Sequence, residues 1–367
     1  MRTTRLVTAL LISIGTGAVG AGAVSAPAQS MQPPAVRPAA QAVADIPVSF
    51  RVQNINRSDV PCASDGRTYT VRGRIVGPAD DIRARRIGAA TMYLHGLSFG
   101  EFFWDFRQAK GYDYAHEQAT RGQVSVVIDR LGYGSSDKVD GNAVCVGSRA
   151  DMTHQMVQQL RSGDYQTSPS GRTPKVRDVY LAGHSYGGQI AQVEAYSFGD
   201  IAGLVVIGYS DRVQSDVLKA SAAYAAGVCA TGGVPVGGGG PTGYAPFGPP
   251  SGAAAALFNS ARPRVRQAGL TQLTVDPCGD TASFAAATEI DLARIGSVRV
   301  PVLVVGGGQD ALFPKPAARD QVSLFTGSRD VTGRTLARTA HAFTLEQSHQ
   351  QFANVVRRWL QEQQRGR

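Results

Sequence analysis

The residue of this chain best suited to act as a nucleophile is Ser185. It lies in a Gly-x-Ser-x-Gly pattern at 183–187, which a mostly apolar stretch, 179–182, precedes and a helix-like stretch, 189–195, follows. A buried strand, a sharp turn and a helix in this order are the context of a nucleophile elbow, where larger side chains at the glycine positions would collide with the strand or the helix. The helix directs its free N–H groups toward the serine. The alternative is a solvated serine in a glycine-rich turn, because so short a pattern also arises by chance.

A serine hydroxyl needs a base that takes its proton, and the base needs an acid that holds its tautomer. We expect His341 to be the base, because it lies in a loop, whereas His349 falls inside the last predicted helix, where a packed histidine is expected. The expected acid is Asp310, which follows an apolar strand on a glycine-rich loop and precedes His341 in the chain. Asp211 also follows a strand and is the alternative acid. A loop aspartate can also simply form a turn.

The elements around these residues alternate in the manner of an α/β fold. Continuous apolar runs predict parallel strands that helices cover on both faces, and they fall at 89–94, 124–128, 204–207 and 301–305. Stretches of alternating apolar and polar residues predict half-buried strands at 48–54 and 68–76. Helices are predicted at 112–121 and 151–161.

The last helix and an aromatic segment complete the predicted core. The last helix is expected to begin at a capping box, Thr344-x-x-Gln347, and to pack one apolar stripe that includes Trp359 on the sheet. The segment 99–106 is rich in aromatic residues and follows a His-Gly turn. Its side chains are expected either to line a substrate pocket or to belong to the core.

The strand and helix alternation breaks between Asp211 and about Ser297. This stretch is dominated by Ala, Gly and Pro and is bracketed by Cys229 and Cys278. We interpret 212–297 as a cap inserted over the active site, between core segments 45–211 and 298–367. The alternative is a flexible linker, which the return of the chain to the same predicted sheet disfavours.

Composition limits the class of protein and of partner. The chain has 367 residues, 43% of them hydrophobic and 18% charged, which suits one large α/β domain with an insertion. Its formal net charge is +9, but the basic residues are scattered, apart from short clusters at 83–86 and 262–266. There is no zinc-ligand spacing and no basic stripe interleaved with aromatic residues, so the sequence does not predict a nucleic-acid partner.

The N-terminal residues have the features of a secretory signal. Arg2 and Arg5 form a charged start, residues 6–24 carry no charge, and 26–28 form an Ala-x-Ala cleavage site. We therefore expect residues 1–28 to be a signal peptide and the protein to be secreted, with no stable membrane span after cleavage. The Pro/Ala-rich residues 29–44 are predicted to be a disordered lead-in. The alternative is an uncleaved anchor, although no charged flank follows the apolar stretch.

Four cysteines in an exported chain suggest two disulfides. Three pairings are possible. We favour Cys62–Cys145 and Cys229–Cys278, because each pair falls in loops of the same region. None of the four lies in a Cys-x-x-Cys pattern or beside a histidine, so we expect neither a metal site nor thiol catalysis.

Several motifs together carry a resemblance to a known family. They are Gly183-His184-Ser185-Tyr186-Gly187, His95-Gly96-Leu97, the segment from Asp129 to Ser136, Gly308-Gln309-Asp310, and His341. The chain resembles the α/β-hydrolase fold superfamily, and most of all exported bacterial serine esterases and lipases. The resemblance runs from Val48 to the C-terminus, apart from the predicted cap. Its motifs are specific for the superfamily but not for a substrate.

The resemblance implies an α/β-hydrolase fold, with a mostly parallel sheet, helices on both faces and an inserted cap. It makes Ser185 the nucleophile, Asp310 the acid and His341 the base. The backbone N–H groups of Leu97 and Tyr186 would form the oxyanion hole. It implies no cofactor and no metal. The function expected from it is hydrolysis of carboxylic esters, whether small molecules or lipids, through an acyl-enzyme.

Other functions remain open on the same scaffold. The same three residues also serve acyl transfer, amide or lactone hydrolysis and cofactor-free haloperoxidase chemistry. A catalytically silent binding protein is a further alternative. Ser185 argues against the dehalogenase and epoxide-hydrolase branches, which usually place Asp at this position. Neither the acyl chain length of the substrate nor the oligomeric state follows from the sequence.

Overall fold

The computed structural model describes residues 13, 42–168 and 173–366. Apart from residue 13, the predicted signal peptide lies outside the described residues, as does most of the predicted lead-in. The chain divides into two units, residues 1–39 and 40–367, and the description below concerns the second. Within the described ranges, no helix is both long enough and apolar enough to cross a membrane.

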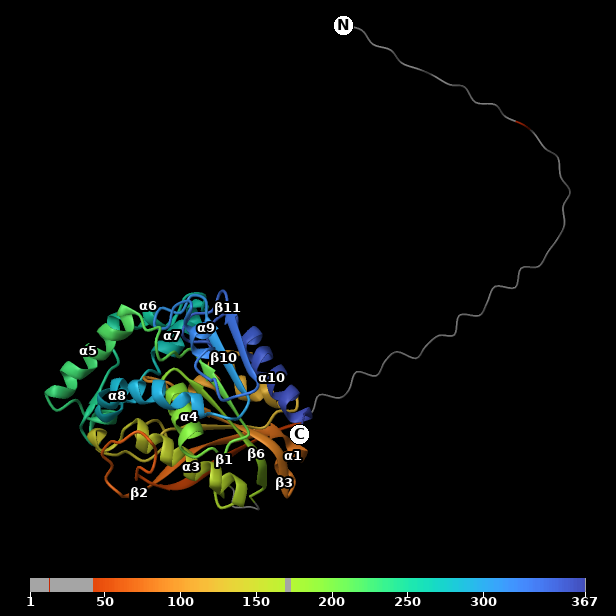
Figure 1. Cartoon of the computed structure of the whole chain (residues 1–367), viewed down its shortest axis with the longest axis horizontal. Coiled ribbons are helices and arrows are strands. Elements are labelled where there is room, and N and C mark those ends of the chain that lie inside the picture. The colour runs from red at the N-terminus through yellow and green to blue at the C-terminus, as the bar shows by residue number, and fades with distance from the viewer. Residues whose placement is uncertain (1–12, 14–41, 169–172, 367) are drawn as a thin grey trace, which may run out of the picture. The chain divides into compact units, whose positions relative to one another are not determined.

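A nine-stranded sheet forms the centre of the fold, in the order β11-β10-β7-β6-β3-β4-β2-β1-β5 (Figure 1). The strands are β1 (Val43–Gln53), β2 (Thr68–Pro78), β3 (Arg86–Leu94), β4 (Ser125–Asp129), β5 (Gln166–Thr167), β6 (Lys175–His184), β7 (Gly203–Ile207), β10 (Val302–Gly307) and β11 (Val331–Leu336). The strands from β11 to β4 run parallel, and β2, β1 and β5 continue the sheet with antiparallel pairing. Every residue of β4, β7 and β10 is buried, as expected for parallel strands covered on both faces.

Helices cover both faces of this sheet. They are α1 (Ala79–Arg83), α2 (Tyr114–Ala119), α3 (Val146–Ser162), α4 (Tyr186–Ser197), α9 (Ala317–Val322) and α10 (His349–Arg365). Along β7, a Cβ at Gly203 would meet Trp359 of α10, whereas Val206 lies against Gly188 of α4. Because side chains alternate along a strand, positions 203 and 206 face opposite sides, and so α10 and α4 cover opposite faces.

Residues 212–297, here called the 212–297 segment, contain most of the remaining helices. These are α5 (Asp216–Ala230), α6 (Ala253–Leu257), α7 (Pro263–Leu270) and α8 (Cys278–Arg294), with a two-stranded sheet of β8 (Tyr244–Ala245) and β9 (Asp276–Pro277). Short 3-10 helices lie at Glu101–Phe103, Gly141–Ala143, Val236–Gly238, Pro250–Gly252 and Ile295–Ser297. Figure 1 shows α5 and α6 on the side of the molecule away from α1 and α10. The segment is therefore folded, while its role and boundaries as a cap stay a prediction.

Both favoured disulfide pairs are present. Cys62 is bonded to Cys145 at the start of α3, and Cys229 near the end of α5 is bonded to Cys278 at the start of α8. Two disulfides are typical of proteins that fold in an oxidising compartment.

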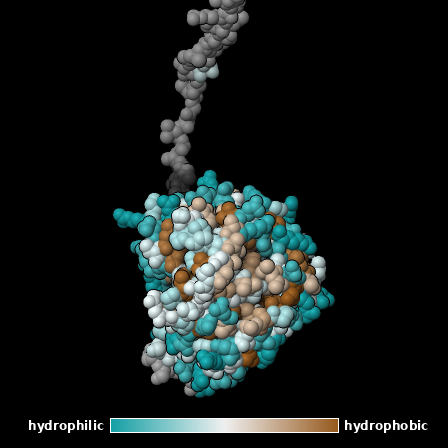
Figure 2. Space-filling model, turned by 90° about the vertical axis from the view of Figure 1, so that its left-hand side faces the viewer, coloured by the Kyte–Doolittle hydropathy of each residue, from teal (hydrophilic) through white to brown (hydrophobic). Residues whose placement is uncertain are grey.

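The large apolar side chains that the described residues expose all lie in the 212–297 segment. Of the large apolar side chains that the described residues expose, Val217, Tyr224 and Val234 belong to α5 and the residues just after it, and the other is Leu292 of α8. Figure 2 shows this side of the molecule, where brown and tan residues gather in the middle and teal polar residues surround them.

The structure differs from the prediction at the start of the first strand and at the start of the last helix. Strand β1 already begins at Val43, inside the predicted lead-in. The predicted capping box at Thr344 is wrong, because α10 begins at His349 and the Thr344 hydroxyl is buried without a hydrogen-bond partner in the described structure. The Glu346 carboxylate instead accepts hydrogen bonds from the backbone N–H groups of Asn259 and Ser260, at 2.9 and 2.7 Å. This turn therefore anchors the 212–297 segment rather than starting the helix.

A buried ion pair joins α8 to the core. The Asp280 carboxylate accepts two hydrogen bonds from the Arg149 guanidinium of α3, both of 2.9 Å, and lies 3.4 Å from the Arg130 guanidinium. All three side chains are almost fully buried. Two arginines share one carboxylate here, so removal of that charge leaves both cations uncompensated in a low-dielectric environment.

We expect Asp280→Asn to lower the free energy of unfolding by about 3–5 kcal/mol, because it breaks a buried ion pair and keeps both arginines. Urea unfolding followed by tryptophan fluorescence measures this loss. Asp216→Asn is the matched control, since its side chain is fully exposed and, among the described residues, forms an ion pair only with Lys219, at 3.4 Å. Equal effects of the two substitutions would mean that the Asp280 pair contributes no more to stability than an exposed ion pair does.

Candidate active site

Ser185 lies at the turn between β6 and α4 in a backbone conformation that non-glycine residues rarely adopt. Its φ and ψ are 54° and −125°, and among the described non-glycine residues only Ser98 shares a positive φ. The flanking glycines are required by close backbone contacts. A Cβ at Gly183 would lie 2.0 Å from the Gly187 carbonyl oxygen, and one at Gly187 would lie 2.4 Å from the Leu94 carbonyl oxygen. The chain therefore stores strain at the serine and surrounds it with residues that permit it.

His341 and Asp310 form a hydrogen-bonded pair beside Ser185. Asp310 follows β10, and its Oδ2 lies 2.9 Å from His341 Nδ1. Its Oδ1 accepts hydrogen bonds from the backbone N–H groups of Leu312 and Phe313, at 2.9 and 3.0 Å, which fix the carboxylate. Ser185 and His341 line the same cavity. Within the described part of the chain, no hydrogen bond joins their two side chains directly.

Asp211, the alternative acid, is placed differently. Its buried carboxylate accepts hydrogen bonds from the side chains of Gln192, Tyr209 and Gln321, at 2.7 to 3.0 Å. These partners come from α4, from the residues just after β7 and from α9, and none of them is a histidine. The structure thus brings Asp310, and not Asp211, to His341.

His184, which precedes Ser185 in the chain, packs against the residues around the turn. His184 Nε2 donates a hydrogen bond of 2.8 Å to the His341 carbonyl oxygen, and its ring stacks on Phe103 at 4.2 Å. Burial holds the pKa of His184 well below its ordinary value, so the ring stays neutral. Phe103 belongs to the aromatic segment 99–106, in which Phe99, Trp104 and Phe106 are buried as well. These four aromatic side chains are core beneath the serine, whereas Phe102 is half-buried and lines the larger cavity described below. No residue of the segment lines the cavity that contains Ser185.

The turn at residues 95–98 packs directly against Ser185. A Cβ at Gly96 would lie 2.9 Å from Ser185 Cβ. Leu97 of this turn and Tyr186, the first residue of α4, both line the cavity. Among the described residues, neither of their backbone N–H groups donates a hydrogen bond, so both are available to a bound molecule.

Asp276 of β9 holds this turn in place. It accepts a hydrogen bond from the Ser98 backbone N–H at 2.6 Å and another from the Ser98 hydroxyl at 3.1 Å. The Tyr133 hydroxyl donates a third at 2.8 Å. Burial raises the pKa of Asp276 to about 7, although these hydrogen bonds and Arg130 oppose that shift. Sequence reasoning missed Asp276, because no local pattern marks it and its partners lie far away in the chain.

A small apolar cavity of about 40 Å³ adjoins Ser185 and His341. Most of its other walls are apolar and come from the 212–297 segment: Leu218, Ser221, Phe247, Ala253, Ala256, Leu257, Leu273 and Phe284. Leu97, Ser98, Tyr186, Leu312 and Phe313 complete it. A larger and more polar cavity of about 760 Å³ lies elsewhere and includes none of the three residues expected to react. The smaller cavity is therefore the candidate active site, because it contains the side chains that could react, although it is not the larger of the two.

Comparison with known proteins identifies the family. The family described as alpha/beta hydrolase matches residues 93–355. The chain belongs to this family. The match confirms the predicted fold class, and membership supports hydrolase activity. No protein of curated function matches the chain by sequence.

Solved structures of esterases share the fold of this alpha/beta hydrolase at low identity. A thermophilic esterase from Thermogutta terrifontis is 18% identical, with a TM-score of 0.56 over 86% of this chain and 99% of that one. A putative aryl esterase from Burkholderia cenocepacia is 17% identical, with a TM-score of 0.55 over 86% and 98%. An esterase from Exiguobacterium antarcticum is 16% identical, with a TM-score of 0.56 over 85% and 98%.

We expect Gly183→Ala to lower the free energy of unfolding by about 3 kcal/mol or more, because the new Cβ would overlap the Gly187 carbonyl oxygen. Gly227→Ala is the matched control. Gly227 lies in the interior of α5, and its Cβ would meet nothing within 4 Å, so this substitution should stabilise the protein by about 0.5–1 kcal/mol. Urea unfolding of both variants measures the contrast. A Gly183→Ala protein as stable as the parent would show that the turn is not constrained as described.

Proposed function

We propose that this alpha/beta hydrolase is an exported serine hydrolase that cleaves carboxylic esters. One observation carries the proposal: Ser185, in its strained turn, lines one cavity with His341, whose Nδ1 is hydrogen-bonded to Asp310. This is the arrangement in which a histidine can accept the serine proton while a carboxylate orients it. The two disulfides support export, and the predicted cleavage after residue 28 would supply its route.

The reaction would proceed in two halves. With its Nδ1–H donating to Asp310, His341 has an unprotonated Nε2, which takes the proton of Ser185 as the serine oxygen attacks the ester carbonyl. The negative oxygen of the tetrahedral intermediate accepts hydrogen bonds from the N–H groups of Leu97 and Tyr186. His341 then gives its proton to the departing alcohol, and an acyl-enzyme remains. Water, deprotonated by His341, attacks the acyl group. His341 then returns this proton to the serine oxygen as the acyl bond breaks, which releases the acid and the free serine.

The cavity suggests which esters fit. Its walls are mainly apolar, and its volume of about 40 Å³ is far below the several hundred Å³ of pockets that enclose drug-sized ligands. Space of this size accommodates a short, uncharged acyl group. The solved structures named above are two esterases and a putative aryl esterase, which supports an ester substrate for this chain as well.

Turnover of p-nitrophenyl esters from acetate to palmitate tests the proposal. We expect activity that is greatest for the short acyl chains and that falls by about 10³-fold or more in Ser185→Ala, because the nucleophile is lost. Fluorophosphonate should label the parent protein at Ser185 and leave the variant unlabelled. A parent protein that neither hydrolyses any ester nor accepts the label would contradict the proposed mechanism and favour a binding role. Labelling without ester turnover would instead indicate another acyl substrate.

The identity of the acid is tested by a pair of asparagine variants. We expect Asp310→Asn to lower kcat by about 10²- to 10⁴-fold, because an amide no longer holds the required tautomer of His341. Asp211→Asn should leave kcat of the folded protein within about threefold, since its partners are Gln192, Tyr209 and Gln321. Circular dichroism controls for the folded fraction of each. A large loss of kcat in Asp211→Asn, with little change in Asp310→Asn, would instead assign the acid to Asp211.

A further inference from the structure

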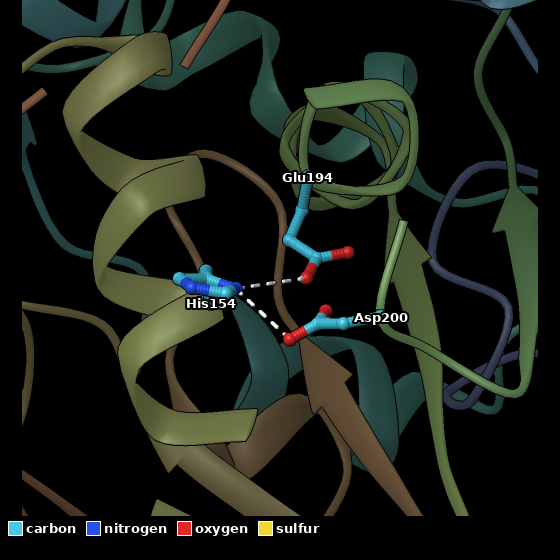
Figure 3. Close-up of side chains that lie close together, drawn as sticks. All are labelled: His154, Glu194 and Asp200. Carbon is cyan, nitrogen blue, oxygen red and sulfur yellow. Dashed lines mark ion pairs between the residues drawn. The ribbon is translucent and has the colours of Figure 1, made fainter. Parts of the chain in front are cut away.

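Three potential metal ligands meet on the protein at a distance from the Ser185 cavity. His154 belongs to α3, Glu194 to α4, and Asp200 to the residues between α4 and β7. One ligand atom of each lies within 4.8 Å of the other two. His154 Nδ1 is 3.0 Å from Asp200 Oδ2 and 4.0 Å from Glu194 Oε1. Figure 3 shows the imidazole and both carboxylates pointing into one space between the elements.

Glu194 is the unusual member of this cluster. Its side chain is fully buried, and in the described structure both of its carboxylate oxygens are without a hydrogen-bond partner. The buried His154 Nδ1 also lacks an aligned partner, despite its short distance to Asp200. Buried polar groups in native proteins are almost always satisfied, so an ionised carboxylate aimed at two other ligands needs either a bound cation or a proton that it shares with Asp200.

We propose that His154, Glu194 and Asp200 bind one divalent transition-metal ion, with Zn²⁺ as the preferred ion. Two carboxylates and a neutral imidazole balance a double positive charge. Ligands at about 2.0–2.2 Å from Zn²⁺ in a tetrahedral site lie about 3.3–3.6 Å from one another. The two observed separations from Nδ1, 3.0 and 4.0 Å, lie on either side of that range, so small side-chain rotations suffice.

The choice of ion follows from the ligand types. An imidazole nitrogen favours zinc and its neighbours in the first transition row, whereas calcium and magnesium prefer oxygen ligands alone. His154 and Asp200 are 19% and 15% exposed, so an ion can enter from solvent and keep a water molecule as a fourth ligand. Glu194 forms the closed inner wall of the site.

Neighbouring side chains hold two of the ligands in orientation. The His154 ring stacks on Phe198, with ring centres 4.1 Å apart and planes 11° apart. The Gln158 side-chain amide donates a hydrogen bond to Asp200 Oδ2. Such contacts set the direction of a ligand before the metal arrives, and they are a regular feature of metal sites.

A proton is the competitor for this site. Burial, together with the nearby Asp200, raises the pKa of Glu194 well above its ordinary value, so a protonated Glu194 beside a His154–Asp200 ion pair is the alternative state. The two states differ in what they predict. The metal state requires saturable binding that depends on all three side chains, whereas the proton state gives no such binding.

The bound ion would stabilise the fold rather than take part in ester hydrolysis. It would tie α3 to α4 and to the start of the connection toward β7, while none of its ligands lines the Ser185 cavity. The inference therefore stands independently of the proposed function. The expectation of no metal site followed from the absence of a local ligand motif, and these ligands are far apart in the chain.

Calorimetric titration of chelator-treated protein, purified without a histidine tag, with Zn²⁺ tests the site. We expect one ion per chain and an increase in Tm of about 3 °C or more at saturation. Glu194→Gln and His154→Gln should each weaken Zn²⁺ binding by more than about tenfold. Loss of a residue that only orients a metal ligand already weakens metal binding by about tenfold or more, and these two residues would be ligands themselves. His116→Gln, at an exposed histidine of α2, is the matched control and should bind as the parent does.

Two outcomes would overturn the proposal. One is a parent protein without saturable Zn²⁺ binding, and the other is undiminished binding by the Glu194 or His154 variant. Crystals of the parent protein soaked in Zn²⁺ give a test that does not depend on how the variants fold. An anomalous-scattering peak between the three side chains supports the site, and a peak only at other residues contradicts it.

Discussion

The pairing of β3 with β6 is the constraint on which the candidate active site depends. In this parallel pair, Leu94 lies opposite Gly183, so both strands end at the same level of the sheet. The turn at 95–98 and the turn that carries Ser185 therefore emerge side by side, and Gly96 is in contact with Ser185. A glycine is needed at 96, 183 and 187 because two chain reversals share one small space. The available N–H groups of Leu97 and Tyr186 reach the same cavity for this reason.

Two buried aspartates attach the 212–297 segment to the core beside the candidate active site. Asp276 and Asp280 both come from the 212–297 segment, yet they bind partners in the core: Ser98 and Tyr133 for one, Arg149 for the other. These interactions link the backbone beside Ser185 to a segment that departs from the regular alternation of strand and helix. Local sequence does not encode such a link, because each partner is an ordinary polar residue until the fold brings the two together.

The sequence predicted the features that depend on neighbours along the chain. Strand, turn and helix around Ser185 follow from apolar runs and glycines, and loop placement separated His341 from His349. Asp310 could not be separated from Asp211 in this way, because both follow buried strands; only the tertiary contact of Asp310 with His341 distinguishes them. The start of α10 was missed for a similar reason. The Gln347 side chain, predicted to complete the capping box, instead donates a hydrogen bond to the Ser260 carbonyl oxygen, and the neighbouring Glu346 binds the backbone at 259–260. The His154, Glu194 and Asp200 cluster likewise exists only after α3 and α4 pack together.

The anchors and the cavity walls of the 212–297 segment are different residues. Asp276, Asp280 and the Cys229–Cys278 disulfide attach the segment to the core and to itself, whereas Leu218, Phe247 and Leu257 face the cavity. Substitutions at the wall positions leave the ionic and covalent attachments in place. This separation gives evolution and protein engineering a set of wall positions at which the shape of the cavity can change while the residues proposed to react and these attachments are retained.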